Sequence, residues 1–135
     1  MNARLLVIAV TPCGCDAEGE LLAQHDDGTP LRAYYQGSAR QALARFVPGR
    51  WMEIELTGRL CQARATETGE PRLVCIGNSF RFHAYGPVSG WTRRGDDTHP
   101  VLQAGFPLAL DIESPPPRVE LGQWLEVTGE LWVEE

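Results

Sequence analysis

Two stretches decide the fold of this chain: WMEIELTGRL, residues 51–60, and WLEVTGELWV, residues 124–133. Each is entered through Gly-x-Trp, alternates apolar and polar residues, and contains Thr-Gly. In the first, Met52, Ile54 and Leu56 share one face, which is the period of a half-buried strand. We therefore expect a strand at each place, with Thr-Gly marking a bend or bulge.

Three further strands are expected before residue 51. Arg4–Thr11 is a β-branched, apolar run. Glu20–His25 and Leu31–Gln36 flank Asp26–Pro30, in which Asp-Gly supplies the left-handed residue of a hairpin turn.

One short helix follows these strands. Ser38 can cap it and Gln41 is the capping-box partner three residues on. The Pro-Gly pair at 48–49 ends it. Its apolar face is formed by Ala39, Ala42, Leu43 and Phe46.

After the helix, Arg59–Ala65 continues the strand, Thr66–Pro71 forms a turn, and Arg72–Tyr85 is the next strand, with a kink at Gly77. Five strands with one helix between the third and fourth predict an all-β chain with the five-stranded Greek-key barrel of the OB fold. We expect residues 1–86 to form the barrel, 87–105 a Gly-rich loop or linker, and 106–135 a C-terminal β extension that packs on or extends the barrel.

The extension repeats part of the barrel. Residues 107–132 parallel residues 30–60: both run Pro-Leu, a connector, Gly-x-Trp-x-Glu and Thr-Gly-x-Leu. In the second copy Pro115-Pro116-Pro117 replaces the helix, because consecutive prolines forbid it. The extension is either a partial second OB-like unit or a set of strands that extend the first barrel.

Residues 30–84 resemble the second half of bacterial single-stranded-DNA-binding proteins. The corresponding features are Gly37, the helix Ser38–Phe46, Pro48-Gly49, Thr57-Gly58-Arg59-Leu60, Gly69 and Ser79-Phe80. The resemblance implies an OB fold and sequence-independent binding of single-stranded DNA in replication, repair or recombination. Where that family stacks bases on rings, this chain has Pro30, Gln36 and Ala63–Ala65, so those stacking positions do not carry over.

Charge is distributed unevenly along the chain. The net charge is −6, and all 12 basic residues are arginine. Residues 31–94 hold ten arginines against four glutamates, whereas the two ends are acidic. A basic middle favours an anionic partner there, and the acidic C-terminal part favours a protein partner.

Single-strand binding needs cations along the backbone and rings that stack on bases. Trp91, one residue before Arg93-Arg94, is the best local candidate, because a ring and two cations lie close together there. The predicted nucleic-acid-binding residues are Arg32, Tyr34, Tyr35, Arg59, Arg64, Arg72, Arg81, His83, Tyr85, Trp91, Arg93 and Arg94.

The alternative function is an OB-fold assembly or interaction subunit that does not touch nucleic acid. We expect a homodimer or higher homo-oligomer, single-stranded DNA or RNA as the ligand, a cytoplasmic location and no membrane segment, since no apolar run reaches about 20 residues. Catalytic motifs and cofactor signatures are absent from the sequence, so we expect no enzyme and no cofactor. The four cysteines are either free thiols or, if the strands converge, a four-Cys metal site.

Overall fold

The computed structural model of the chain describes residues 2–113 and 118–134. Its strands form one mixed, highly curved sheet, and a single short helix interrupts them. The elements in chain order are β1 (Ala3–Pro12), β2 (Glu18–His25), β3 (Pro30–Gln36), α1 (Ala39–Arg45), β4 (Trp51–Ile54), β5 (Leu56–Ala65), β6 (Arg72–Cys75), β7 (Arg81–Arg94), β8 (Asp97–Gln103), β9 (Pro107–Ile112) and β10 (Trp124–Val133).

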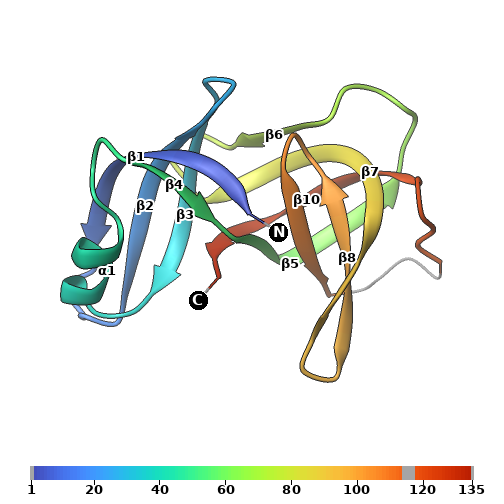
Figure 1. Ribbon diagram of the computed structural model, residues 1–135. Helices are drawn as coiled ribbons and strands as arrows, with labels where there is room; N and C mark the ends of the chain where they lie inside the picture. Colours follow the sequence, from blue (N-terminus) through green and yellow to red (C-terminus); the bar gives the residue numbers. More distant parts are fainter. Residues whose placement is uncertain (1, 114–117, 135) are drawn as a thin grey trace.

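The hairpin turn and the helix cap predicted for the first third of the chain are confirmed, but the predicted apolar face of the helix is only partly buried, because Leu43 is 55% exposed. β2 and β3 form an antiparallel hairpin, and Gly28 in its turn has a φ of 94°. The Ser38 side chain accepts from the Gln41 backbone N–H, and the Gln41 side chain accepts from the Ser38 N–H, which completes the capping box. Phe46, at the end of α1, is buried against Tyr35 with ring centroids 5.9 Å apart. The helix therefore covers one end of the strands β1–β3 (Figure 1).

β5, β7, β8, β9 and β10 close into a five-stranded barrel. β7, β8 and β9 form an antiparallel meander. β9 then runs parallel to β5, β5 antiparallel to β10, and β10 antiparallel to β7. The circuit therefore returns to its first strand. One parallel contact in a ring of five is the arrangement of an OB barrel.

β1, β2 and β3 belong to a second circuit with the same order. They form a meander, and β4 pairs antiparallel with β1. β4 runs on into β5, separated only by Glu55, and the end of β10 lies parallel to β3 through the pair Trp132 and Tyr34. The N-terminal barrel is thus closed by the last residues of the chain. Figure 1 shows the two barrels as the left and right halves of the molecule.

The repeated stretches are the strands that pass from one barrel to the other. The first starts as β4 beside β1 and continues as β5 beside β9. The second starts in β10 beside β7 and ends beside β3. Each barrel therefore takes its fourth strand from one stretch and its fifth from the other, and the two stretches pair antiparallel along their shared length. This explains why the sequence holds two versions of one pattern.

The Thr-Gly steps lie where these strands cross. A Cβ on Gly58 would stand 2.8 Å from the Cys61 sulfur and 3.0 Å from the Phe82 ring. A Cβ on Gly129 would stand 2.8 Å from the same sulfur and 2.9 Å from the Arg59 carbonyl oxygen. The predicted irregularity is present, because the β5–β10 register shifts between Thr128 and Glu130. Both glycines are needed because the neighbouring strand leaves no room for a side chain.

A single hydrophobic core runs through both barrels. Leu5, Leu21 and Phe46 fill the N-terminal barrel, and Phe82 and Leu110 fill the other, each at most 1% exposed. β5 is covered on both faces where the barrels meet, since Leu56, Thr57 and Gly58 are consecutive buried residues.

Two expectations about strands are wrong. Residues 72–85 are not one kinked strand: Gly77, with a φ of 60°, lies in a turn that folds β6 back onto β7. Residues 87–105 are not a loop or linker, because β7 continues to Arg94 and pairs with β8. Residues 1–86 also do not form a barrel by themselves, because the N-terminal barrel takes the strand beside β3 from β10.

The predicted proline replacement of the helix, residues 115–117, lies outside the described residues. Of the flanking connection, residues 113 and 118–123 are described and contain no helix. Within the described chain, no helix has the length and apolar character needed to cross a membrane.

Candidate nucleic-acid interface

The outer face of β5, β10, β7 and β6 brings together six of the twelve predicted binding residues. Because side chains alternate along a strand, residues in register on neighbouring strands line up in rows across the sheet. One row contains Arg64, Glu126, Tyr85 and Arg72. The next contains Gln62, Thr128, His83 and Val74, and a third contains Arg59, Glu130 and Arg81. We call this surface the arginine face; its predicted members are Arg59, Arg64, Arg72, Arg81, His83 and Tyr85.

Glu126 organises the middle of the arginine face. Its carboxylate accepts hydrogen bonds from Arg64 Nε at 3.0 Å and Nη2 at 2.6 Å. His83 Nε2 lies 2.9 Å from the other carboxylate oxygen. The Arg64 hydrogen bond, followed by that of His83, lowers the pKa of Glu126 below its usual 4.5. Arg64 is held in place by this contact while 75% of its side chain stays exposed.

Rings and guanidinium groups alternate on the same face. The Arg72 guanidinium lies over the Tyr85 ring at 4.8 Å, and the His83 ring is 4.7 Å from that of Tyr85. Arg59 lies over the Trp132 ring at 4.3 Å. The two arginine–ring contacts are at cation–π distances, and each presents a flat, positively charged surface suited to stacking.

An aromatic cluster extends the arginine face toward the N-terminal barrel. Tyr34 packs edge-on against Trp132 with centroids 4.7 Å apart and lies 5.0 Å from Phe80. Sequence reasoning missed Trp132 and Phe80 as parts of this surface. The alternation in residues 124–132 does place Trp132 on the face of Glu126, but only the parallel contact with β3 shows that it meets Tyr34.

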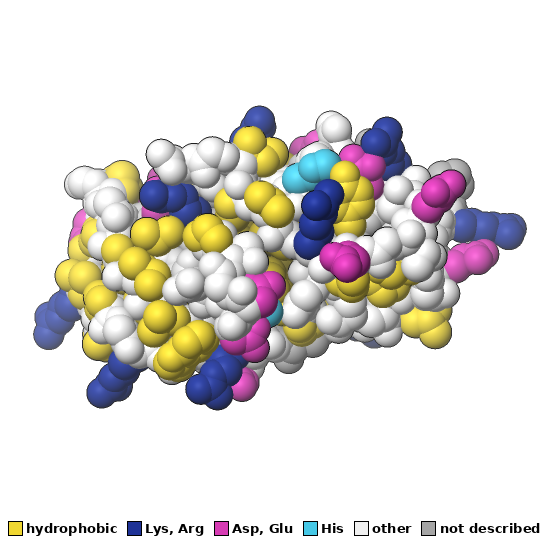
Figure 2. Space-filling view, turned by 90° about the horizontal axis from the view of Figure 1, so that it is seen from above, with side chains coloured by type: hydrophobic (Ala, Val, Ile, Leu, Met, Phe, Trp, Pro, Cys, Tyr) yellow, Lys and Arg dark blue, Asp and Glu magenta, His cyan; other side chains and the backbone are white. Residues whose placement is uncertain are grey.

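Three shallow hollows follow the arginine face. One lies between Leu60, Ile76 and Arg81, the next between Arg64 and Glu126, and the third between Arg72, Tyr85 and Trp124. Figure 2, which looks onto the side that carries β6, shows basic side chains beside acidic and hydrophobic ones rather than a continuous basic patch. The rows of the sheet hold four arginines and two glutamates, Glu126 and Glu130, and two more glutamates, Glu67 and Glu70, line the third hollow, so positive and negative charges are mixed along this surface.

The two predicted tyrosines of β3 point in opposite directions. Tyr35 is 2% exposed and belongs to the core, so the expectation that it contacts a ligand is wrong. Its neighbour Tyr34 faces outward, and a hydrogen bond with Glu18 raises the Tyr34 pKa to about 12. Arg32, on the outward face with Tyr34, lies 3.6 Å from Glu20. The predicted binding residues Tyr34 and Arg32 are therefore already in contact with acidic side chains.

The remaining predicted residues lie on the β7–β8 hairpin rather than in a mobile loop. Trp91 and Arg93 are exposed on β7 opposite Pro100 and Thr98. Arg94 is already ion-paired: its guanidinium lies 3.0 Å from Glu55 and 2.6 Å from Glu134, and its side chain is only 24% exposed. Arg94 ties the hairpin to the crossing strands and is not a free cation for a ligand.

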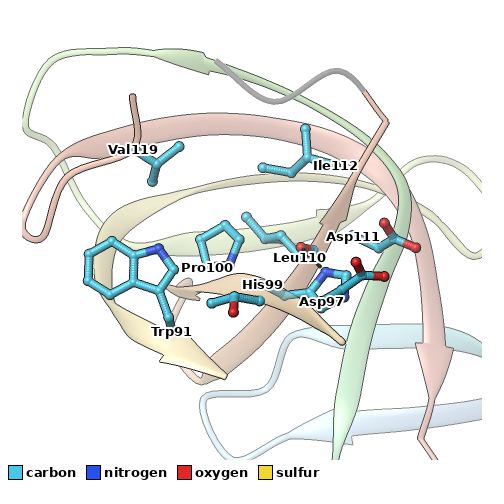
Figure 3. A pocket seen from close by; sticks show the side chains of 9 residues that line it. Trp91, Asp97, His99, Pro100, Leu110, Asp111, Ile112 and Val119 are labelled. Atoms are coloured by element: carbon cyan, nitrogen blue, oxygen red, sulfur yellow. Dashed lines mark hydrogen bonds between the residues drawn. The ribbon is translucent and has the colours of Figure 1, made fainter. Parts of the chain in front are cut away.

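Trp91 borders a pocket of about 470 Å³ on the outer face of β8 and β9 (Figure 3). Strands 2 and 3 of an OB barrel form its usual ligand face, and β8 and β9 occupy those positions in this barrel. His99, whose Nδ1 lies 3.0 Å from the Leu110 carbonyl oxygen, forms the floor together with Pro100. Asp97 and Asp111 lie at one side of the pocket, and their negative charges repel phosphate.

The four cysteines do not converge on one site. Cys61 is buried in the core, and the Cys75 sulfur contacts the Arg32 backbone. Cys13 and Cys15 are exposed in the β1–β2 turn, where they lie close to Glu18. The four-Cys alternative is therefore wrong: the group of metal-ligating side chains found among the described residues is Cys13, Cys15 and Glu18.

Comparison of the chain with protein-family models, with curated proteins and with solved structures gave no match.

Proposed function

We propose that this chain is an OB-fold accessory protein of DNA replication, repair or recombination that binds single-stranded DNA without sequence preference on its arginine face. The observation that carries the proposal is the meeting of Arg59, Arg64, Arg72 and Arg81 with outward rings on one continuous sheet surface. Arginine suits this role because its planar guanidinium both pairs with phosphate and stacks on bases.

The location differs from the usual OB ligand face for an electrostatic reason. The outer faces of β2–β3 and β8–β9 carry Glu18, Glu20, Asp97 and Asp111, which repel a phosphate backbone. On the arginine face the central carboxylate, Glu126, is already paired with Arg64 and His83. A strand that follows the three hollows would meet arginines and rings, with Glu67 and Glu70 beside the third hollow.

The test is fluorescence anisotropy with a labelled poly-dT of about 20 nucleotides, longer than the span of about 4–16 nucleotides that one OB fold covers. If the four arginines each neutralise one phosphate, the slope of log K against log salt is about −2.8 for a single strand. Affinity then falls about 50-fold between 50 and 200 mM salt. Absence of binding at low salt, or binding that salt leaves unchanged, contradicts the proposal.

The hairpin is tested separately. Trp91 and Arg93 lie beside the acidic pocket, so replacing both by alanine gives a smaller loss than replacing Arg72 and Arg81. An equal or larger loss moves the interface to the β7–β8 hairpin.

A second candidate function, an assembly subunit, has its own observation. Apolar side chains are exposed on the outer side of β1 and β4, where Ile8 is 44% and Trp51 46% exposed beside half-buried Leu6. In Figure 2 hydrophobic side chains gather on the half formed by the N-terminal barrel. Such a patch suits a homodimer contact. Light scattering tests it: we expect a dimer that Ile8→Glu converts to a monomer, whereas a monomeric wild-type chain contradicts it.

A further inference from the structure

The β1–β2 turn gathers three metal-ligating side chains outside the proposed interface. The turn runs Cys13-Gly14-Cys15-Asp16-Ala17 and leads into Glu18, the first residue of β2. The two thiol sulfurs and a Glu18 carboxylate oxygen all lie within 4.8 Å of one another. Both cysteines are exposed and Glu18 is half-buried, so a metal ion can reach all three from solvent.

These separations suit a tetrahedral ion. With Zn–S bonds of about 2.3 Å and Zn–O bonds of about 2.1 Å, tetrahedral ligands stand about 3.8 Å apart for two sulfurs and about 3.6 Å apart for sulfur and oxygen. Small side-chain rotations within the present spacing of 4.8 Å or less therefore complete the geometry.

The turn is held in shape by backbone and Asp16 contacts, and the Glu18 carboxylate is also hydrogen-bonded to Tyr34. The Cys13 N–H donates to the Glu18 carbonyl at 2.8 Å and the Gly37 N–H to the Ala17 carbonyl at 2.7 Å. Asp16, with a φ of 58°, accepts a hydrogen bond at 2.8 Å from the N–H of Ala39, the first residue of α1. The turn is thus anchored both to its own hairpin and to the helix, which lowers the ordering cost of binding.

The two cysteines are also in direct contact through the backbone. The Cys15 N–H points at the Cys13 sulfur, with N and S 3.3 Å apart. The thiolate is the form of cysteine that binds metal. Two thiolates favour Zn²⁺ over the oxygen-seeking ions Mg²⁺ and Ca²⁺.

We propose that Cys13, Cys15 and Glu18 bind one Zn²⁺ ion through two thiolates and one carboxylate. Three protein ligands leave the fourth tetrahedral position to water or to an external ligand, the pattern of an open zinc site. The site lies in the β1–β2 turn and does not depend on nucleic-acid binding at the arginine face.

The experiment is a titration of the reduced full-length chain with Co²⁺, followed by displacement with Zn²⁺. Thiolate ligation gives a near-ultraviolet sulfur-to-cobalt charge-transfer band, and tetrahedral geometry gives intense visible bands. We expect one Co²⁺ per chain, and Cys13→Ser and Cys15→Ser each to halve the charge-transfer intensity and weaken Zn²⁺ binding at least tenfold. Glu18→Gln weakens Zn²⁺ binding but keeps both thiolate contributions.

Two variants serve as matched controls. Cys75→Ser removes a cysteine outside the turn, and Glu20→Gln removes an acid two residues along β2, so both bind metal like the wild type. Thermal unfolding of each variant shows that it is folded. Failure of the reduced wild type to bind Zn²⁺, a Co²⁺ spectrum without sulfur bands, or full Zn²⁺ affinity in Cys13→Ser overturns the proposal. Because no oligonucleotide is present, failure here leaves the proposed DNA function untouched.

Discussion

The crossing of the two repeated strands predicts a specific intolerance of side chains at Gly58 and Gly129. Alanine at either position places its Cβ 2.8 Å from the Cys61 sulfur, and at Gly129 also 2.9 Å from a backbone oxygen. Contacts this short force neighbouring atoms to shift, and overpacking of a core costs about 1–3 kcal/mol. Both substitutions therefore destabilise the chain.

The loss is large enough to measure by thermal unfolding. Unfolding entropy of about 2.1 cal/mol/K per residue gives about 280 cal/mol/K for the 135-residue chain, so each kcal/mol lowers Tm by about 3.5 °C. Gly58→Ala and Gly129→Ala are each expected to lower Tm by about 4–10 °C. Circular dichroism or differential scanning calorimetry provides the measurement.

Gly90 is the matched control. It lies in β7, and a Cβ built on it meets no heavy atom within 4 Å. Gly90→Ala is therefore expected to stabilise the protein by about 0.4–1 kcal/mol, because alanine reduces the conformational entropy of the unfolded chain, and to raise Tm slightly. Opposite signs for the crossing glycines and for Gly90 are the expected signature.

Cys61→Ala gives a second check. Removing the sulfur relieves the closest contact at Gly58, so Gly58→Ala costs less in the Cys61→Ala background, by about 1 kcal/mol. Rescue at Gly129 is smaller because the Arg59 carbonyl remains. If alanine at 58 and 129 behaves like alanine at 90, the strands do not cross as described and the reasoning is refuted.

Three further predictions concern single side chains. The Tyr35 hydroxyl is buried without a hydrogen-bond partner among the described residues. Tyr35→Phe is therefore expected to leave the free energy of urea unfolding unchanged or to raise it by up to about 1 kcal/mol, and a clear decrease would contradict the absence of a partner. Arg94→Ala removes the cation shared by Glu55 and Glu134, which are half-buried, so it costs about 1–3 kcal/mol while exposed Arg93→Ala stays within about 0.5 kcal/mol; equal costs count against the ion-pair account. Arg64 and His83 lower the pKa of Glu126 below 4.5, so the stability that Glu126 contributes is present above pH 4.5 and is lost as the pH falls through the folded-state pKa. Glu126→Gln is therefore expected to make the free energy of urea unfolding depend less on pH in the acid range. Superimposable curves of unfolding free energy against pH for the wild type and the variant contradict this.

The sequence predicted those features whose cause is local. Ser38 with Gln41 and Asp27 with Gly28 determine a cap and a turn within a few residues, and both are present. The paired Gly-x-Trp stretches likewise showed that part of the barrel is repeated. For the cap and the turn, local chemistry was enough because the decisive contacts lie within a few positions of each other.

Features that depend on distant partners were missed. The alternation of residues 82–88 indicates that the strand continues, but glycines at 86 and 90 are typical of a linker, and this led to the wrong expectation. Gly86 is required for another reason: the Gln103 backbone approaches it closely. Alternation places Tyr34 and Tyr35 on opposite faces without saying which face is the core. The parallel contact of Trp132 with β3 joins residues almost 100 positions apart, so only the folded chain reveals it.

The most direct test of the arginine face compares salt slopes for poly-dT binding in the wild type, the double variant Arg72→Ala with Arg81→Ala, and the control Arg40→Ala, an exposed arginine on α1. Each phosphate that the protein no longer neutralises makes the slope of log K against log salt shallower by about 0.7 for a single strand. We expect the double variant to be shallower than the wild type by about 1.4, while the Arg40→Ala slope is unchanged. Equal slopes for the wild type and the double variant, with DNA still bound, would contradict the assignment of this face.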